Sequence, residues 1–78
     1  MKVYVASYVY DNDIIGITKS IEGCDKLIRK IAEDDGYADK IRFTTEECYN
    51  HVIGSYIFYT RDKGEETAFI IEEFELGK

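Results

Sequence analysis

The sequence of 78 residues contains no proline and no tryptophan, and its only cysteines are Cys24 and Cys48. Two cysteines are too few for the disulfide frameworks that hold many small secreted domains together. In a reducing compartment they are most simply small apolar side chains in a core. Low-complexity stretches, internal repeats and Ser/Gly-rich linkers are also missing. Residues 1–78 are therefore expected to fold as a single domain.

Long hydrophobic runs are absent as well. The longest are a handful of residues, whereas a helix that crosses a membrane needs about 20 apolar residues. The sequence passes from Met1-Lys2 directly into strand-like residues, without the apolar region of a signal peptide. These absences predict a cytoplasmic protein that has no membrane partner.

Basic residues are the minority charge. The chain has 10 Lys and Arg against 16 Asp and Glu, a formal net charge of −6. This charge opposes direct binding to nucleic acid, which depends on Lys and Arg displacing counterions from phosphates. It equally opposes an anionic membrane surface. A protein target with a basic surface is compatible in sign, although solubility alone also explains an acidic surface.

Four segments have the composition of β-strands, because they are dense in Val, Ile, Tyr and Phe. They are residues 2–10, 14–19, 55–61 and 67–76. An Asx-rich turn at 11–13 is expected to join the first two strands into a hairpin, and a turn at 62–65 to join the last two.

Two helices are expected between the hairpins. Ser20 fits the N-cap of a helix at 21–34, in which apolar residues recur on one face. Residues 35–43 are expected to be a loop with a short extended piece. Thr44 and Glu47 then have the spacing of a capping box, which predicts a short second helix that ends near Gly54.

The predicted order is β-β-α-α-β-β, which is typical of an α+β fold: a four-stranded antiparallel sheet with two helices on one face. The helices can cover one face only. In the first strand, the residues expected beneath the helices are Val3, Val5 and Val9. The residues expected on the open face are Tyr4, Tyr8 and Tyr10.

Three explanations of a Tyr-rich open face remain open. The rings can lie half-exposed in water, they can join two copies in a homodimer, or they can recognise a partner. An aromatic sheet face is also found in proteins that bind single-stranded RNA. Those proteins carry basic residues beside the rings, whereas acids are expected here, so no direct nucleic-acid binding is predicted.

Cys48 and His51 are three residues apart. Such a Cys-His pair could supply a nucleophile and its general base, or two of the ligands of a metal site. An orienting group, an oxyanion hole or further paired ligands are not marked in the sequence. The simpler interpretation places Cys48 in the core and His51 on a helix surface. We therefore expect a non-enzymatic protein with no catalytic residue, no metal and no cofactor.

Acidic residues gather at the end of the first predicted helix, at the start of the second and in the last hairpin. Asp34 and Asp35 oppose the dipole at a helix C-terminus, which is a local misfit that indicates a role elsewhere. Together with the tyrosines these acids make up the candidate partner-binding set. The set is Tyr4, Tyr8, Tyr10, Glu33, Asp34, Asp35, Asp39, Glu46, Glu47, Glu65, Glu66, Glu73 and Glu75.

The two ends of the chain, KVYVASYVYDNDIIGITKS before a helix and the terminal FIIEEFELGK, resemble small uncharacterised domains of bacteria and their phages. Residues 36–66 depart from that pattern. In size and acidity the chain also resembles phage-encoded inhibitors of host defence, such as anti-CRISPR proteins. This resemblance implies an inhibitor in the host cytoplasm that blocks a basic nucleic-acid-binding surface of its target, with tyrosines as anchors. The alternative is a self-associating structural module whose acidity serves solubility alone.

Overall fold

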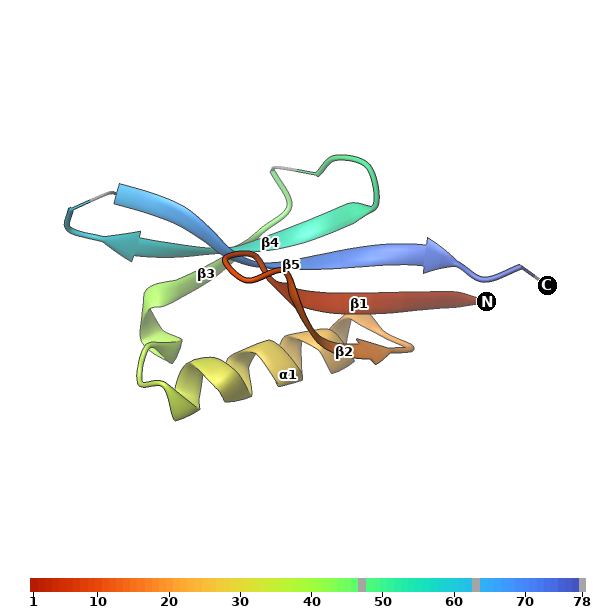
Figure 1. The fold of residues 1–78 in the computed structure, drawn as a ribbon, viewed down its shortest axis with the longest axis horizontal. Helices are drawn as coiled ribbons and strands as arrows, with labels where there is room; N and C mark the ends of the chain where they lie inside the picture. Colours follow the sequence, from red (N-terminus) through yellow and green to blue (C-terminus); the bar gives the residue numbers. More distant parts are fainter. Residues whose placement is uncertain (47, 63, 78) are drawn as a thin grey trace.

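The computed structural model describes residues 1–46, 48–62 and 64–77. Its elements follow the chain in the order β1 (Lys2–Tyr8), β2 (Asp13–Thr18), α1 (Ile21–Asp34), the 3-10 turn η1 (Ala38–Lys40), β3 (Ile41–Thr44), β4 (Val52–Thr60) and β5 (Gly64–Glu75). The strands form one antiparallel sheet with the order β2-β1-β5-β4-β3. Helix α1 lies along one face (Figure 1).

The predicted four-stranded sheet with two helices is therefore wrong, since the described residues form a five-stranded sheet and a single α-helix. The fifth strand is β3, which lies where a loop with a short extended piece was expected. It pairs with β4 from Ile41 opposite Phe58 to Thr44 opposite Ser55. The turn predicted at 62–65 joins β4 and β5, although Lys63 lies outside the described residues.

The second helix fails for a local reason. The Thr44 hydroxyl accepts a hydrogen bond from the Glu46 amide at 3.1 Å, so Thr44 closes a turn after β3 instead of capping a helix. Its expected capping partner, Glu47, lies outside the described residues. A helix of about two turns is not stable by itself. The β-branched Val52 and Ile53 instead extend β4, which gains pairing with β5.

The helix predicted at 21–34 is confirmed. The Ser20 hydroxyl accepts a hydrogen bond from the Gly23 amide at 3.0 Å, which satisfies one of the free donors of the first turn. Buried Cys24, Ile28 and Ala32 face the sheet. A β-carbon at Gly23 would lie 2.9 Å from the β-carbon of Thr18, so this glycine lets the helix approach β2 closely.

The faces of β1 are the reverse of the prediction. Tyr4, Ala6 and Tyr8 lie on the side of α1: Ala6 is buried in the core with the helix residues, and the two tyrosines pack against that core. Val3 and Val5 lie on the opposite face, since successive residues of a strand alternate. Both faces of the strand are apolar, so hydrophobicity could not decide between them. The small side chain of Ala6 determines which face of β1 lies beneath α1, because it lets the helix approach the strand. The rings of Tyr4 and Tyr8 pack against the core on either side of Ala6.

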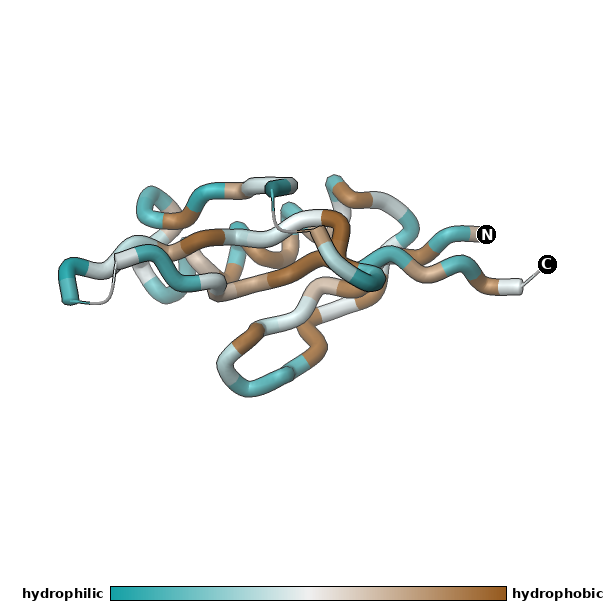
Figure 2. The backbone as a smooth tube through the Cα atoms, turned by 90° about the horizontal axis from the view of Figure 1, so that it is seen from above, coloured by the Kyte–Doolittle hydropathy of each residue, from teal (hydrophilic) through white to brown (hydrophobic). Residues whose placement is uncertain are grey.

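The open face of the sheet is therefore aliphatic rather than Tyr-rich. Ile17 lies opposite Val5 in the β1–β2 ladder and is 63% exposed. Ile14 lies opposite Ser7 and is 65% exposed. Figure 2 shows hydrophobic residues along the middle of the sheet and hydrophilic residues at its turns and ends. No helix among the described residues is long and apolar enough to cross a membrane.

The molecule is elongated, with extents of 46 × 25 × 20 Å. Figure 1 shows that the two chain termini lie at one end. The β4–β5 hairpin and the C-terminal end of α1 lie at the other. The acidic residues near the end of β5, Glu73 and Glu75, are thereby separated from those at the end of α1 and in the β4–β5 hairpin.

Candidate functional site

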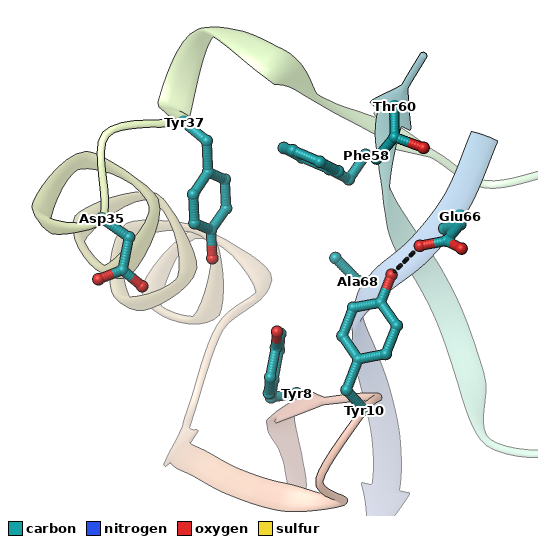
Figure 3. Close-up of a pocket in the computed structure, with 8 residues that line it drawn as sticks. All are labelled: Tyr8, Tyr10, Asp35, Tyr37, Phe58, Thr60, Glu66 and Ala68. Atoms are coloured by element: carbon teal, nitrogen blue, oxygen red, sulfur yellow. Dashed lines mark hydrogen bonds between the residues drawn. The ribbon is translucent and has the colours of Figure 1, made fainter. Parts of the chain in front are cut away.

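A hollow of about 230 Å³ opens beside the C-terminal end of α1, on the helix side of the sheet (Figure 3). We call it the aromatic hollow. Its lining residues come from four segments of the chain, so the tertiary fold creates it. They are Tyr8, Tyr10, Asp35, Tyr37, Phe58, Thr60, Glu66 and Ala68.

Four aromatic rings form the walls as two pairs. Tyr8, the last residue of β1, and Tyr10, in the turn that follows, have ring centroids 5.2 Å apart in an edge-to-face arrangement. Tyr37 and Phe58 form a second edge-to-face pair at 5.4 Å. In Figure 3 the two pairs stand on different sides of the hollow, so a group inside it meets rings from both.

The end of α1 places Tyr37. Gly36 has a φ of 81°, the left-handed conformation that commonly ends a helix. Its amide donates to the Glu33 carbonyl at 3.1 Å, and the Tyr37 amide donates to the Ala32 carbonyl at 2.9 Å. These two bonds form the Schellman motif, which turns the chain back and brings the Tyr37 ring against Phe58.

The depth of the hollow comes from an irregularity in the sheet. Tyr56 pairs with Phe69, but the next residue, Ile57, pairs with Thr67, so Ala68 is an extra residue in β5. Such a bulge re-aims the side chains beside it. Ala68 is only 3% exposed and has the smallest side chain of the lining, so it leaves room where a larger residue would fill the space.

Carboxylates stand among the rings. The Tyr10 hydroxyl donates a hydrogen bond to the Glu66 carboxylate at 2.5 Å, and mainly this bond raises the pKa of Tyr10 to about 12. Burial raises the pKa of Tyr37, with a smaller contribution from the negative charge of Asp35. Asp35 is the C-cap of α1, where the helix dipole adds partial negative charge. No Lys or Arg among the described residues forms an ion pair with Asp35.

A second hollow of about 250 Å³ shares Tyr8, Asp35 and Tyr37 with the first. Asp13 and Ile15 of β2 are also part of its lining. Asp35 therefore borders two adjoining spaces, and Asp13 adds another carboxylate to the same end of the molecule.

The structure brings together four of the predicted partner-binding residues: Tyr8, Tyr10, Asp35 and Glu66. Others lie nearby without lining the hollow. Glu33 and Asp34 are exposed in the last turn of α1. Asp39 borders a depression of about 650 Å³ that shares Phe58 and Thr60 with the hollow and that also contains Lys40 and Arg61. Glu65 forms an ion pair with Arg42 at 3.0 Å.

The remaining predicted residues lie elsewhere. Tyr4 is beside Glu73 at the end of the molecule that holds the termini, and burial, followed by the hydrogen bond to Glu73, raises its pKa. Glu73 pairs with Lys2 at 3.7 Å, and Glu75 pairs with the N-terminal amine at 3.3 Å. Glu46 is in the exposed segment after β3, and Glu47 lies outside the described residues.

Sequence reasoning missed Tyr37, Phe58, Thr60 and Ala68. A signal for Tyr37 was present, since an apolar residue directly after a helix-ending glycine commonly packs back onto the helix. Ala68 gave no such signal, because its place in the lining depends on the bulge between β4 and β5.

A second tyrosine–carboxylate group lies beneath the middle of α1, and we call it the Tyr56 cluster. Tyr56 has no exposed surface, and its hydroxyl donates a hydrogen bond to the Asp25 carboxylate. Burial, followed by this bond, raises the pKa of Tyr56. Arg29 donates to Asp25 at 3.0 Å, and its guanidinium carbon lies 5.9 Å from the centre of the Tyr56 ring.

Cys48 is exposed, so its predicted place in the core is wrong, whereas Cys24 is buried. The Cys48 thiol lies 3.0 Å from the Thr45 carbonyl oxygen and 3.3 Å from that of Ile53. The His51 ring stacks on Phe74 at 4.5 Å and is not on a helix. Within residues 1–46, 48–62 and 64–77, no group of three or more His, Cys, Asp or Glu side chains could hold a metal ion.

Comparisons with models of protein families, with curated proteins and with solved structures found no match to this chain. Function is therefore inferred from the residues of the hollow and their surroundings. Electron-rich ring faces and carboxylates attract the same kind of ligand, an organic cation.

Proposed function

We propose that the protein is a small non-catalytic binding protein whose acidic end docks onto a basic surface of a protein target. The target surface would be of the kind that otherwise binds nucleic acid, so that binding inhibits the target. The aromatic hollow carries this proposal, because it joins four rings with Asp35 and Glu66 in one concave site. Tyrosines are enriched in surfaces that anchor a protein partner, and complementary charges steer such a partner onto them.

The division of the acids between the two ends supports the same conclusion. At the end that holds the termini, Glu73 and Glu75 pair with Lys2 and the N-terminal amine. At the hollow end, Asp34 and Asp35 follow one another where the helix dipole disfavours negative charge. Acids that oppose local stability are expected where a binding function retains them.

The proposal is tested with a synthetic peptide of alternating Arg, Gly and Lys residues, titrated calorimetrically into the protein. Because exposed charges are screened by salt, the dissociation constant should rise steeply between about 50 and about 500 mM NaCl. Replacing Asp34 and Asp39 together by Lys should weaken binding by about tenfold or more.

The matched control replaces Glu46 and Glu75 together by Lys, which changes the net charge equally but away from the hollow. This variant should bind the peptide within about twofold of the unaltered protein. Equal loss in both double variants would mean that only net charge matters, and would overturn the proposed acidic binding end. Binding that is indifferent to salt would overturn it as well.

A second candidate function is self-association as a structural module. The exposed Ile14 and Ile17 on the open face of edge strand β2 favour it, because exposed aliphatic residues on an uncovered strand promote pairing between chains. Light scattering of the protein and of an Ile17→Lys variant tests it. A concentration-dependent dimer that the substitution abolishes would support self-association, and a monomer at all concentrations would exclude it.

A further inference from the structure

We infer that the aromatic hollow is a slot for a single arginine side chain of the partner protein. This inference rests on the proposed function and names the chemical group by which the partner is held. The observation behind it is that the hollow repeats, in open form, an arrangement that the protein fills with its own arginine under α1.

The Tyr56 cluster shows that filled arrangement. The Asp25 carboxylate accepts hydrogen bonds from both the Tyr56 hydroxyl and the Arg29 guanidinium. Arg29 also lies over the Tyr56 ring. One guanidinium thus meets an aromatic face and a carboxylate together. A planar cation with several N–H donors suits this combination.

The aromatic hollow offers the same two kinds of contact to an incoming group. Its rings come from Tyr8, Tyr10, Tyr37 and Phe58, and the carboxylate of Asp35 stands at its edge. The Tyr10 hydroxyl donates a hydrogen bond to the Glu66 carboxylate, which makes the Tyr10 ring more electron-rich and more attractive to a cation. No Lys or Arg is among the described residues of the lining.

The size of the hollow fits one side chain. Its volume is about 230 Å³. This volume accommodates a guanidinium group with part of its alkyl stem.

Arginine fits better than the other cations. Asp35 and the tyrosine hydroxyls supply hydrogen-bond acceptors, and a quaternary ammonium has no N–H to give them. A lysine ammonium can donate, but it is compact and strongly hydrated and does not stack on rings as a guanidinium does. The two edge-to-face pairs present ring surface from two directions, which favours a flat group between them.

Two peptides of equal charge test the inference, both made of Lys and Gly, with one central position occupied by Arg in the first and by Lys in the second. The unaltered protein should bind the Arg peptide about fivefold more tightly or better. Asp35→Asn should abolish this preference. Asp34→Asn removes the same charge from the adjacent, non-lining residue and should retain it. Added tetramethylammonium, at equal ionic strength to NaCl, should leave the preference unchanged.

Ala68→Leu is a second variant, because the larger side chain fills the bottom of the hollow and should also remove the preference for Arg. Circular dichroism establishes whether it folds, and if it does not, the Asp35 and Asp34 variants decide alone. Equal binding of both peptides by the unaltered protein would overturn the arginine slot and leave the proposed function standing. Loss of the Arg preference in Asp34→Asn as in Asp35→Asn would also overturn the slot. Binding of neither peptide would overturn both.

Discussion

The Tyr56 cluster and the aromatic hollow are built from the same parts and differ in where the cation comes from. Under the middle of α1, Arg29 pairs with Asp25 and lies over the Tyr56 ring, so the protein's own guanidinium occupies the cation position. Beside the end of α1, rings and carboxylates surround an open space. The comparison indicates that the first arrangement holds the helix on the sheet, whereas the second is left for a partner.

Helix position explains part of this difference. Asp25 and Arg29 are four residues apart on one face of α1, in the acid-first order that stabilises a helix. Asp35 follows the last turn, where no later helical residue can pair with it and the dipole is unfavourable. The first carboxylate therefore contributes to stability, and the second is expected to reduce it slightly.

The largest expected difference is between two Tyr→Phe substitutions. Tyr56→Phe removes a buried hydroxyl that donates to a carboxylate, and should lower the free energy of unfolding by about 1.5–3 kcal/mol. Tyr10 is 52% exposed, so Tyr10→Phe should change it by no more than about 0.5 kcal/mol. Urea unfolding of both variants measures the difference, and equal effects would remove the distinction between a closed and an open group.

Arginine substitutions come next in size. Arg29→Ala removes the ion pair with Asp25 and the contact with the Tyr56 ring, and should lower the free energy of unfolding by about 1 kcal/mol. Arg61→Ala, in the exposed depression next to the hollow, is the matched control and should have an effect within about 0.5 kcal/mol. Thermal unfolding distinguishes them. A larger effect at Arg61 would show that the hollow end, and not the Tyr56 cluster, carries the stability.

Asp35→Asn should act in the opposite direction. Removing negative charge from the C-cap should raise the free energy of unfolding by about 0.3–1 kcal/mol at low salt, and Asp34→Asn should do much the same. Chemical unfolding at low and high salt measures the gain and its screening. A loss of stability in Asp35→Asn would mean that Asp35 is a structural residue, which would contradict its assignment to binding.

The smallest expected effect is that of high pH. Below pH 10 Tyr10 is protonated in both states, and the hydrogen bond to Glu66 is intact. Between pH 10 and its folded pKa of about 12, an unfolded tyrosine ionises while Tyr10 stays protonated, so the folded state loses relative stability as pH rises. Tyr10→Phe should show a slightly shallower decline over this range. An identical decline in both proteins would show that the bond to Glu66 adds nothing.

The sequence predicted α1 correctly because its signals were local. The Ser20 cap, the repeat of apolar residues on one face and the Gly36 stop act within a few residues of the helix, and all three are present. The capping box at Thr44 was equally local but misleading. Strand pairing with β5 stabilises Val52 and Ile53 in β4, and a local pattern does not show that competition.

The site was predictable only in part. The misfit of Asp35 at a helix end and the tyrosines of the predicted first strand were visible in the sequence, and the hollow contains Asp35 and two of those tyrosines, Tyr8 and Tyr10. The face of β1 was predicted wrongly because valine and tyrosine are both apolar enough to be buried. Ala68 joins the lining through a bulge in β5 opposite β4, and hydrophobic periodicity does not predict that register shift.

Aromatic NMR resonances during a titration with arginine amide test the central claim most directly. We predict saturable shifts in the four rings of the aromatic hollow and none in Tyr56, where Arg29 already occupies the cation position. Lysine amide at the same ionic strength should give much smaller shifts. Shifts confined to rings outside the hollow, or equal shifts with both amides, would contradict an arginine slot.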